Sequence, residues 1–325
     1  MKENKMIEVS TMSASTEVKT SDIVKPAKKK RQSKNVKNEN WAGIAFVSPM
    51  LIGVSILVLL PIVATFILSL ADWSFITNIS QLKWVGLQNF VDLFQDKIFI
   101  RSLMNNAIFM LTVPICMIIS LFLAIAIDRN VYFKSYFKVA FFMPYISSVV
   151  AIAVVWQVLF HPSLGPINQV LMSLGIDNPP KWIADPSFAL VSIMFIQIWI
   201  SIGFNMIIYL AALQSIPRDL YEAADIDGAS AWVKFKNITL PMVSPTTFFL
   251  LITGIISTFK VFDLISVLTK GGPMHATSMI VWNLYDTAFV NLDIGHASAM
   301  AVILFFIVFA ITLIQWLGQK KWVNY

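Results

Sequence analysis

The chain has 325 residues, of which 57% are hydrophobic and only 13% are charged. A soluble domain carries about 25% charged residues, so this balance excludes an ordinary soluble enzyme and indicates a membrane protein. The net charge of +6 does not point to nucleic acid, because ten of the 24 Lys and Arg residues lie within the first 40 positions. The single cysteine, Cys116, excludes an intrachain disulfide and a cysteine-based metal site.

Residues 1–40 are polar and basic and show no apolar periodicity, which predicts a disordered cytoplasmic tail. The basic cluster at residues 28–31 is compatible with binding to anionic lipids and with a topology signal alone, of which we favour the second. The first apolar run is far longer than the core of a signal peptide, so we expect no cleavage there.

Six apolar runs are long enough to cross about 30 Å of hydrocarbon. We place these spans at residues 43–71, 105–127, 139–160, 189–213, 246–269 and 297–318. With both termini in the cytoplasm, the cytoplasmic segments hold eighteen Lys and Arg residues and the outer loops hold five, which satisfies the positive-inside rule. The sequence therefore predicts an all-α polytopic membrane protein with six transmembrane helices. Its transmembrane domain covers residues 41–320, and residues 321–325 form a cytoplasmic C-terminus.

Two of the outer loops contain short amphipathic patterns. LQNFVDLF places Leu87, Phe90, Val91 and Phe94 at helical spacing, and INQVLMSLGI repeats this pattern around Val170. A helix that lies on the membrane interface explains both patterns, and so does a docking surface for an external partner. The sequence leaves both interpretations open.

A polar segment, residues 214–241, separates the fourth and fifth spans on the predicted cytoplasmic side. Glu222 lies in the first turn of a predicted helix, where the helix dipole favours a negative charge. Gly228 suits the left-handed residue that ends this helix, and Ser230 can cap a second one. The segment thus reads as a helix, a tight turn and a second helix.

The first of these helices carries a narrow stripe of small apolar residues formed by Leu220, Ala223 and Ala224. Interfacial membrane binding scales with buried apolar area, so this stripe offers little affinity for lipid. Small side chains instead allow another protein surface to approach closely. The stripe therefore favours a protein-docking helix over a plain interfacial loop.

The same segment resembles the EAA signature of ABC-importer permeases. That signature consists of EAA, any three residues, Gly, any nine residues and then Ile-x-Leu-Pro. This chain matches every fixed position, with EAA beginning at Glu222, the glycine at Gly228, and the last motif at Ile238, Leu240 and Pro241. The surrounding IPRDLYEAADIDGAS is similar to the carbohydrate-importing branch. Further matches are GLQNFVDLF in the first outer loop and GGP at residues 271–273 in the last. Together these matches cover most of residues 42–320.

The resemblance implies a type I ABC importer permease fold in a bacterial cell membrane, with residues 214–241 as the cytoplasmic coupling loop. The residues that would couple to the ATPase are Glu222, Ala223, Ala224, Asp227, Gly228, Leu240 and Pro241. Implied partners are a second homologous permease subunit, an ABC ATPase dimer, an extracytoplasmic solute-binding protein and a sugar or oligosaccharide substrate. The sequence has no GxxxxGK[ST] motif, so ATP and Mg are expected on the ATPase and no cofactor on this chain.

Polar or aromatic residues within spans three to five are candidates for the substrate path. Polar groups in a membrane are costly and usually face an interior or a water-filled cavity. The candidates are Gln157, Gln197, Trp199, Asn205, Phe259, Phe262 and Asp263. The alternative is helix–helix hydrogen bonding for the amides and core packing for the aromatic rings. Lys260 and Asp263 are also spaced to pair with each other.

Three other functions fit the sequence less well. An ion-coupled secondary transporter of a small polar solute would normally show repeated halves and unpaired intramembrane carboxylates, and only Asp263 is such a carboxylate. An intramembrane hydrolase needs a nucleophile and a base at matched depth, whereas His161, His275 and His296 all fall in predicted outer loops. A membrane scaffold would use the polar segment for docking alone. We predict no catalytic residue, no metal site and no nucleic-acid partner.

Overall fold

A computed structural model describes residues 34–128 and 132–322 of the chain. Its contacts divide the chain into two units at Val58 and Leu59. Helix α1 (Lys34–Val54) belongs to the first unit and is followed by a π-helical turn, Ser55–Leu59. Residues 34–40 were predicted to be part of a disordered tail but are helical, because KNVKNEN contains no glycine or proline that would stop a helix. The basic cluster at residues 28–31 lies outside the described residues.

The second unit is almost entirely helical. Its longer helices are α2 (Leu60–Leu68), α4 (Lys97–Phe109), α5 (Thr112–Asp128), α6 (Lys134–Ile146), α7 (Val149–Leu159), α9 (Ala189–Gln214), α13 (Ser244–Phe259) and α16 (Ile294–Trp322). Its shorter helices are α3 (Gln88–Gln95), α8 (Pro166–Ser173), α10 (Arg218–Ile226), α11 (Ala231–Lys234), α12 (Leu240–Met242), α14 (Asp263–Leu268) and α15 (Ile280–Tyr285).

A few short elements complete this unit. Two-residue strands β1 (Ala71–Asp72) and β2 (Lys83–Trp84) pair antiparallel, which is a small exception to the predicted all-α fold. The remaining turns are 3-10 turns at Ile79–Gln81 and Trp182–Ala184, and π-helical turns at Phe235–Thr239 and Asp286–Val290.

Four helical segments are long and apolar enough to cross a membrane. They are Gly43–Leu68, Lys97–Asp128, Ala189–Gln214 and Ile294–Gln319. Two bent pairs of helices, Lys134–Ile146 with Val149–Leu159 and Ala231–Met242 with Ser244–Phe259, raise the number to six if each pair is one span. The described chain is therefore a polytopic helical membrane protein in which some of the predicted spans are not single straight helices.

The predicted span 139–160 is the most strongly broken, because α6 and α7 meet at an angle of 96°. Ser147 and Ser148 at the bend are extended, with ψ of 156° and 123°. Pro144 lacks an amide hydrogen, and its ring clashes with the carbonyl group four residues earlier, so the helix ends within a turn. Each arm is shorter than the ~20 residues that a straight span needs.

The predicted span 246–269 also differs, because helix α13 ends at Phe259. The chain then turns, and α14 packs beside α7 with Leu264, Ile265 and Leu268 buried. The sequence did not predict this turn, because a short buried helix and part of a membrane span are both apolar and look alike in composition. Lys260 and Asp263, which the sequence suggested as a pair, do not form an ion pair within the described part of the chain. Both residues are exposed.

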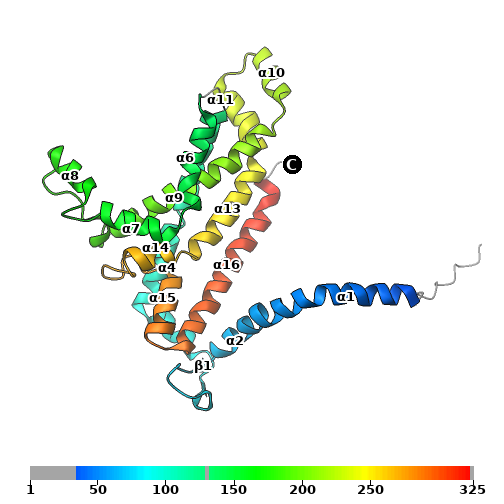
Figure 1. The fold of residues 1–325 in the computed structure, drawn as a ribbon, viewed down its shortest axis with the longest axis vertical. Helices are drawn as coiled ribbons and strands as arrows, with labels where there is room; N and C mark the ends of the chain where they lie inside the picture. The colour runs from blue at the N-terminus through cyan, green and yellow to red at the C-terminus, as the bar shows by residue number, and fades with distance from the viewer. Residues whose placement is uncertain (1–33, 129–131, 323–325) are drawn as a thin grey trace, which may run out of the picture. The chain divides into compact units, whose positions relative to one another are not determined.

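Close helix packing in the second unit depends on two glycines. A Cβ atom on Gly203 of α9 would lie 1.9 Å from the carbonyl oxygen of Phe141 on α6. A Cβ atom on Gly254 of α13 would lie 2.7 Å from Cγ1 of Val113 on α5. Small residues at such crossings let membrane helices approach closely without voids. Helices α5, α6, α9 and α13 thus form one packed group (Figure 1).

The two ends of this packed unit are different. Helices α10 and α11 lie at one end, while β1 and α15 lie at the other (Figure 1). At the second end the Oγ hydroxyl of Ser74 donates to the carbonyl of Leu292 at 2.7 Å, and Nδ2 of Asn89 donates to the carbonyls of Ser69 and Ala71 at 2.9 and 3.0 Å. These bonds tie the loop after α2 to α3 and to the start of α16.

The amphipathic pattern LQNFVDLF forms helix α3, but its apolar face is not the buried one. Leu87, Val91 and Phe94 are exposed, and the helix buries Leu93 and Asn89 instead. Asn89 is buried because it bonds the two backbone carbonyls described above. The second pattern forms α8, where Val170 is exposed. Both helices therefore present apolar side chains outward, which leaves the membrane-interface and docking interpretations open.

Candidate functional site

The polar segment between the fourth and fifth spans folds into a helical hairpin. Helix α10 ends at Ile226, and Gly228 follows with φ of 70°. The amide of Gly228 donates to the carbonyl of Asp225 at 3.1 Å, and that of Ala229 donates to Ala224 at 2.9 Å. This is the Schellman pattern that a left-handed C′ glycine allows. The hydroxyl of Ser230 accepts from the amide of Val233 at 3.4 Å, so the predicted cap is also present.

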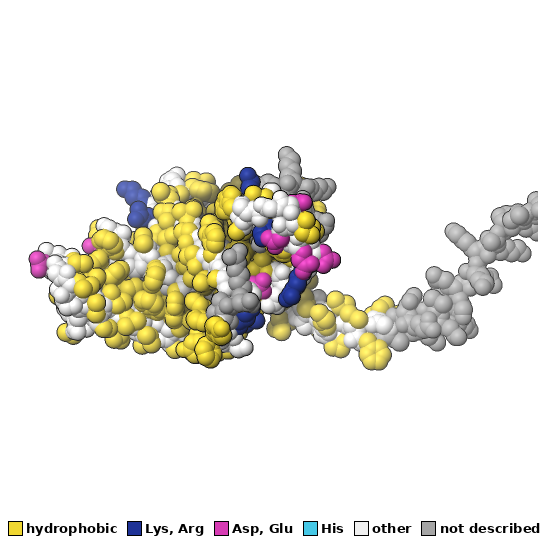
Figure 2. Space-filling view, turned by 90° about the horizontal axis from the view of Figure 1, so that it is seen from above, with side chains coloured by type: hydrophobic (Ala, Val, Ile, Leu, Met, Phe, Trp, Pro, Cys, Tyr) yellow, Lys and Arg dark blue, Asp and Glu magenta, His cyan; other side chains and the backbone are white. Residues whose placement is uncertain are grey.

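The outer surface of the hairpin combines charge with exposed apolar side chains. Glu222, Ala223 and Asp227 are exposed. Sequence reasoning missed Ile226 and Trp232, whose side chains are 87% and 66% exposed. Ile226 follows Ala223 by three residues and so extends the same stripe, a spacing that could have revealed it. Figure 2, which looks onto the end that carries α10, shows acidic and basic side chains together there and hydrophobic side chains over most of the other described surface.

The remaining predicted coupling residues lie around these positions. Ala224 and Pro241 are half-buried, whereas Gly228 and Leu240 are exposed. A surface that combines large apolar side chains with charges is typical of protein–protein contacts. The hairpin therefore has the composition of a docking surface rather than that of a lipid-facing helix.

The inner side of the hairpin is fixed by three contacts that the sequence did not reveal. The hydroxyl groups of Tyr221 and Thr239 lie 2.9 Å apart. Lys234 forms an ion pair with Asp225, which joins the second helix to the first. The ring of Phe235 stacks on Phe122 of α5, with ring centres 6.0 Å apart and an angle of 22° between the planes. The hairpin is therefore held to itself and to the bundle.

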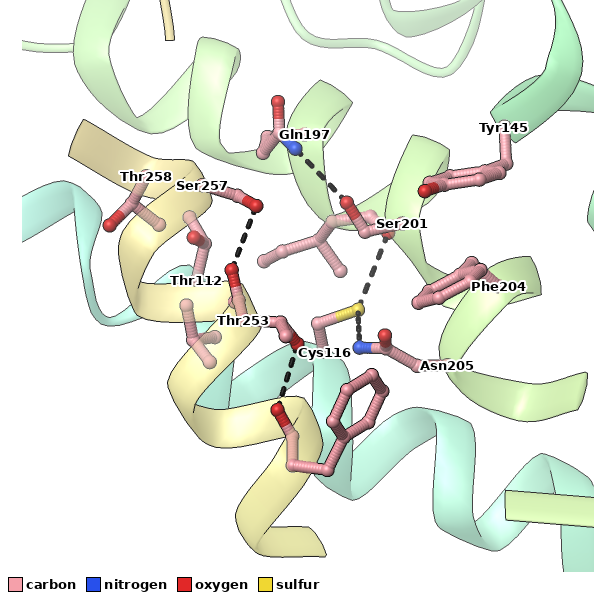
Figure 3. A pocket seen from close by; sticks show the side chains of 14 residues that line it. Thr112, Cys116, Tyr145, Gln197, Ser201, Phe204, Asn205, Thr253, Ser257 and Thr258 are labelled. Atoms are coloured by element: carbon pink, nitrogen blue, oxygen red, sulfur yellow. Dashed lines mark hydrogen bonds between the residues drawn. The ribbon is translucent and has the colours of Figure 1, made fainter. Parts of the chain in front are cut away.

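A cavity with a volume of about 240 Å³ lies among α5, α6, α9 and α13, and its lining combines apolar surface with amide and hydroxyl groups (Figure 3). All fourteen residues that line it are uncharged. Its polar and aromatic members are Thr112, Cys116, Tyr145, Gln197, Ser201, Phe204, Asn205, Phe249, Thr253, Ser257 and Thr258. Such a lining is costly between apolar helices unless it faces water or a ligand.

The two amide side chains of the cavity are held in place by neighbours. Nε2 of Gln197 donates to the hydroxyl of Ser201 at 3.0 Å, and Nδ2 of Asn205 donates to Sγ of Cys116 at 3.3 Å. Their side-chain oxygens accept no hydrogen bond from the described part of the chain. Both oxygens are therefore available to the hydroxyl groups of a ligand.

The cavity also contains an aromatic wall. Tyr145 of α6 and Phe204 of α9 stack with ring centres 4.7 Å apart. Their position beside Gln197 and Asn205 places flat apolar faces next to hydrogen-bonding groups. Pockets of this composition bind small polar molecules, because few polar groups set the orientation and apolar surface supplies the contact area.

The structure divides the seven predicted path residues. It brings Gln197 and Asn205 together in the cavity. Trp199 lies outside it, in an aromatic hollow formed with α6, and Gln157 is exposed on α7.

The other three lie near the end of α13. Phe259 is buried there and borders a groove beside α16, whereas Phe262 stacks on Trp282 and Asp263 begins α14. Hydroxyl residues of α13 were missed, although Thr253 and Ser257 share one helix face at a spacing of four.

Two observations bear on the functions considered from the sequence. Within residues 34–128 and 132–322, no group of three or more His, Cys, Asp or Glu side chains could hold a metal ion. His296 lies in the first turn of α16 and not in a loop as predicted, and its ring contacts Asp293 at 2.8 Å and Asp92 at 3.6 Å. These contacts place it at the end of the bundle that carries β1, away from the cavity.

Comparisons with known proteins identify the family. The family described as binding-protein-dependent transport system inner membrane component matches residues 90–321. The ABC transporter permease protein YesP of Bacillus subtilis (strain 168) is 34% identical over 300 residues, which is 91% of this chain and 96% of that protein. UgpA of Yersinia enterocolitica, an sn-glycerol-3-phosphate transport system permease protein, is 36% identical over 75% of this chain and 82% of its own length.

A solved structure agrees with these relatives. It is a bacterial alginate ABC transporter in complex with an alginate pentasaccharide-bound periplasmic protein. One of its chains aligns with 90% of this chain and 98% of its own length, at a TM-score of 0.77 and 26% identity. The likeness therefore covers almost the whole length of both chains.

Apolar spans around a cavity that carries amide and hydroxyl groups define a multi-pass membrane transport protein. The chain belongs to the family of binding-protein-dependent transport system inner membrane components and is a permease subunit of an ABC importer. It is accordingly a transport subunit located in the inner membrane. This membership agrees with the resemblance found in the sequence. It favours an ABC importer permease over an ion-coupled transporter and over an intramembrane hydrolase.

Proposed function

We propose that this permease carries a neutral sugar or oligosaccharide into the cell, driven by ATP hydrolysis on a separate subunit. The uncharged cavity between α5, α9 and α13 carries the proposal. Recognition of a phosphate or a carboxylate normally uses Arg or Lys, and no such residue is among those that line the described cavity. Amides, hydroxyls and stacked rings instead match the hydroxyl groups and apolar faces of a saccharide.

The names of the relatives support a carbohydrate-like substrate. They also raise the question of whether that substrate is neutral or anionic. The transporters named for sn-glycerol-3-phosphate and for alginate act on polar molecules of the sugar class. Those substrates are anionic, whereas the cavity that we propose as the binding site of this permease has an uncharged lining.

The proposed orientation places the α10–α11 hairpin in the cytoplasm. Basic side chains of α6 and the hairpin, namely Lys134, Lys138, Arg218, Lys234 and Lys236, belong to segments that the positive-inside rule assigns to the cytoplasm. The end with β1 and α15 would then face outward. A solute-binding protein would deliver substrate to that outer end.

The hairpin would dock on the ATPase subunit, which would bind ATP and Mg. Glu222 and the exposed Ile226 would contact that subunit, and Ala223 and Ala224 would permit a close approach. The cavity would be completed by a second homologous permease subunit. A chain of this kind requires an ATPase dimer, since its sequence holds no nucleotide-binding motif.

Assembly with the ATPase is tested by changing the exposed surface of the hairpin. Glu222→Lys and Ile226→Glu should each lower co-purification of the ATPase and substrate-stimulated hydrolysis by about tenfold or more. The first reverses a charge at the proposed interface, and the second buries a charge without a partner there. The matched control for co-purification of the ATPase is Asp177→Lys, which reverses an exposed charge in the loop after α8, on the side proposed to face outward. Normal hydrolysis and uptake in both hairpin variants would show that the hairpin is not the coupling element.

The substrate class is tested with the assembled complex and its cognate solute-binding protein. Neutral oligosaccharides should stimulate ATP hydrolysis, whereas glycerol 3-phosphate and alginate oligosaccharides should not. Stimulation by the anionic compounds alone would contradict the neutral-sugar proposal. Uptake that persists without ATP and collapses with an ionophore would instead favour the ion-coupled alternative.

A further inference from the structure

The hairpin is joined to the three main walls of the cavity in different ways. Helix α9 leads directly into it, and it leads directly into α13 through Val243. Helix α5, which supplies Thr112, Val113 and Cys116 to the cavity, is not adjacent to it along the chain. Movement of the hairpin can therefore reach α5 only through side-chain packing, either indirectly through α9 and α13 or directly from the hairpin.

The stack of Phe122 on Phe235 supplies such a contact. Phe122 lies on α5, two turns from its C-terminal end, and its side chain is 56% exposed. Phe235 is half-buried and packs against the core cluster that contains Ala124 and Ile127 of α5. Ring centres 6.0 Å apart lie within the range in which aromatic pairs attract each other, so displacement of one ring is expected to move the other.

A second pair of residues couples α10 to Phe235. The Tyr221 hydroxyl on α10 bonds the Thr239 hydroxyl, which lies in the same π-helical turn as Phe235. Thr239 is 6% exposed, and its hydroxyl also lies 3.5 Å from the carbonyl oxygen of Lys234. A partly buried bond of this kind resists separation of the two helices, since breaking it leaves the buried Thr239 hydroxyl with a poorer partner. π-Helical turns are frequent at functional positions.

We propose that Phe122 and Phe235, held in register by the Tyr221–Thr239 bond, form the contact through which displacement of the hairpin moves α5 and reshapes the cavity. The inference rests on the proposed coupling to an ATPase. All four are positioning residues, since none of them lines the cavity. The contact adds α5 to the two helices that the hairpin moves through the chain itself.

Cys116 provides a reporter on α5 that needs no knowledge of the substrate. It is the only cysteine of the chain, and it lines the cavity beside Asn205. In the complete complex, the rate at which N-ethylmaleimide modifies Cys116 is measured by mass spectrometry of this chain, with and without ATP. Movement of α5 against α9 should break the Asn205 contact and raise the rate by about fivefold or more when ATP is added.

Phe235→Ala and Phe122→Leu should each remove most of this ATP response while hydrolysis continues. Phe122→Leu changes an exposed side chain, so it tests the contact even if Phe235→Ala prevents assembly. Phe235→Tyr keeps the ring and should restore the response. The matched control is Phe309→Ala, which removes a stacked ring from α16, far along the chain from the hairpin.

Each result bears on the proposal. An ATP response that survives both Phe235→Ala and Phe122→Leu would overturn it, and so would the absence of any response in the unaltered complex. Loss of the response in Phe309→Ala to the same degree would show a general packing effect and would also overturn it. Failure of the proposed function is distinguishable, because no ATPase would then associate with the chain at all.

Discussion

Single residues set the ends of the important elements in this permease. Gly228 adopts φ of 70°, a conformation that costs an L residue roughly 1–2 kcal/mol. Asp293 precedes the long helix α16, and its Oδ1 accepts the amide of His296 at 3.1 Å. The first residue turns the α10–α11 hairpin, and the second starts the last span.

The carboxylate of Asp293 has a pKa below its ordinary value. Burial raises the pKa, but hydrogen bonds from the His296 side chain and amide, together with the charge of that ring, outweigh the burial. A carboxylate with a lowered folded-state pKa stabilises the fold at neutral pH, and this stabilisation is lost as the pH falls through the folded value. The stability contributed by Asp293 is therefore lost at pH values below about 3.9, the pKa of an aspartate in the unfolded chain.

Asp293→Ala should therefore lower the stability of the permease at neutral pH by about 1 kcal/mol, the usual effect of removing a helix cap. The variant should also lose less stability than the unaltered protein when the medium is acidified below about pH 4. Thermal unfolding of the purified protein at several pH values measures both effects. Parallel pH profiles for the two proteins would exclude this role of Asp293.

At the scale of elements, glycine decides how closely the helices pack. Gly203→Ala would place a methyl group against the backbone of α6, since its Cβ would lie 1.9 Å from the carbonyl oxygen of Phe141. Backbone cannot move aside as a flexible side chain can, so we expect a loss of about 1–3 kcal/mol. Thermal unfolding should show it. Gly318→Ala on α16, where nothing lies within 4 Å of the added atom, is the control and should be neutral.

Proline explains two interruptions within spans that the sequence predicted as continuous. Pro144 breaks the third span. The second span is interrupted at Met110 and Leu111, because Pro114 has no amide hydrogen to bond the carbonyl of Met110 and its ring crowds that carbonyl. Local chemistry did not predict which face of α3 is buried. That face is chosen by Asn89, whose partners lie in the loop after α2, while Leu87, Val91 and Phe94 face outward, as both interpretations of the amphipathic pattern expect.

At the scale of the whole molecule, the cavity is assembled from helices that are far apart in the sequence. Gln197 and Asn205 were predictable, because amides are conspicuous in an apolar span. Thr112, Tyr145 and Ser257 were not, because hydroxyl residues are common in membrane helices and often bond their own backbone. The Ser257 hydroxyl does so, donating to the carbonyl of Thr253 at 2.8 Å.

Asn205→Leu tests the cavity directly. Loss of one hydrogen bond to a neutral ligand costs about 0.5–1.5 kcal/mol, so the sugar concentration for half-maximal stimulation of hydrolysis should rise by roughly fivefold. Basal hydrolysis without sugar should remain. Gln157→Leu on α7 is the matched control, since Gln157 is exposed outside the cavity. Equal effects of the two substitutions would mean that the cavity does not bind the substrate.

The sequence by itself determined the membrane class, the number of apolar runs and the capped hairpin, because composition and helix-end chemistry act over a few neighbouring residues. It also carried the family signature at residues 222–241. Only the tertiary structure decided that α14 leaves the fifth span, that the stack of Phe122 on Phe235 joins the hairpin to α5, and that the cavity is uncharged. These features depend on contacts between distant segments, and their free energies come from packing that no local pattern encodes.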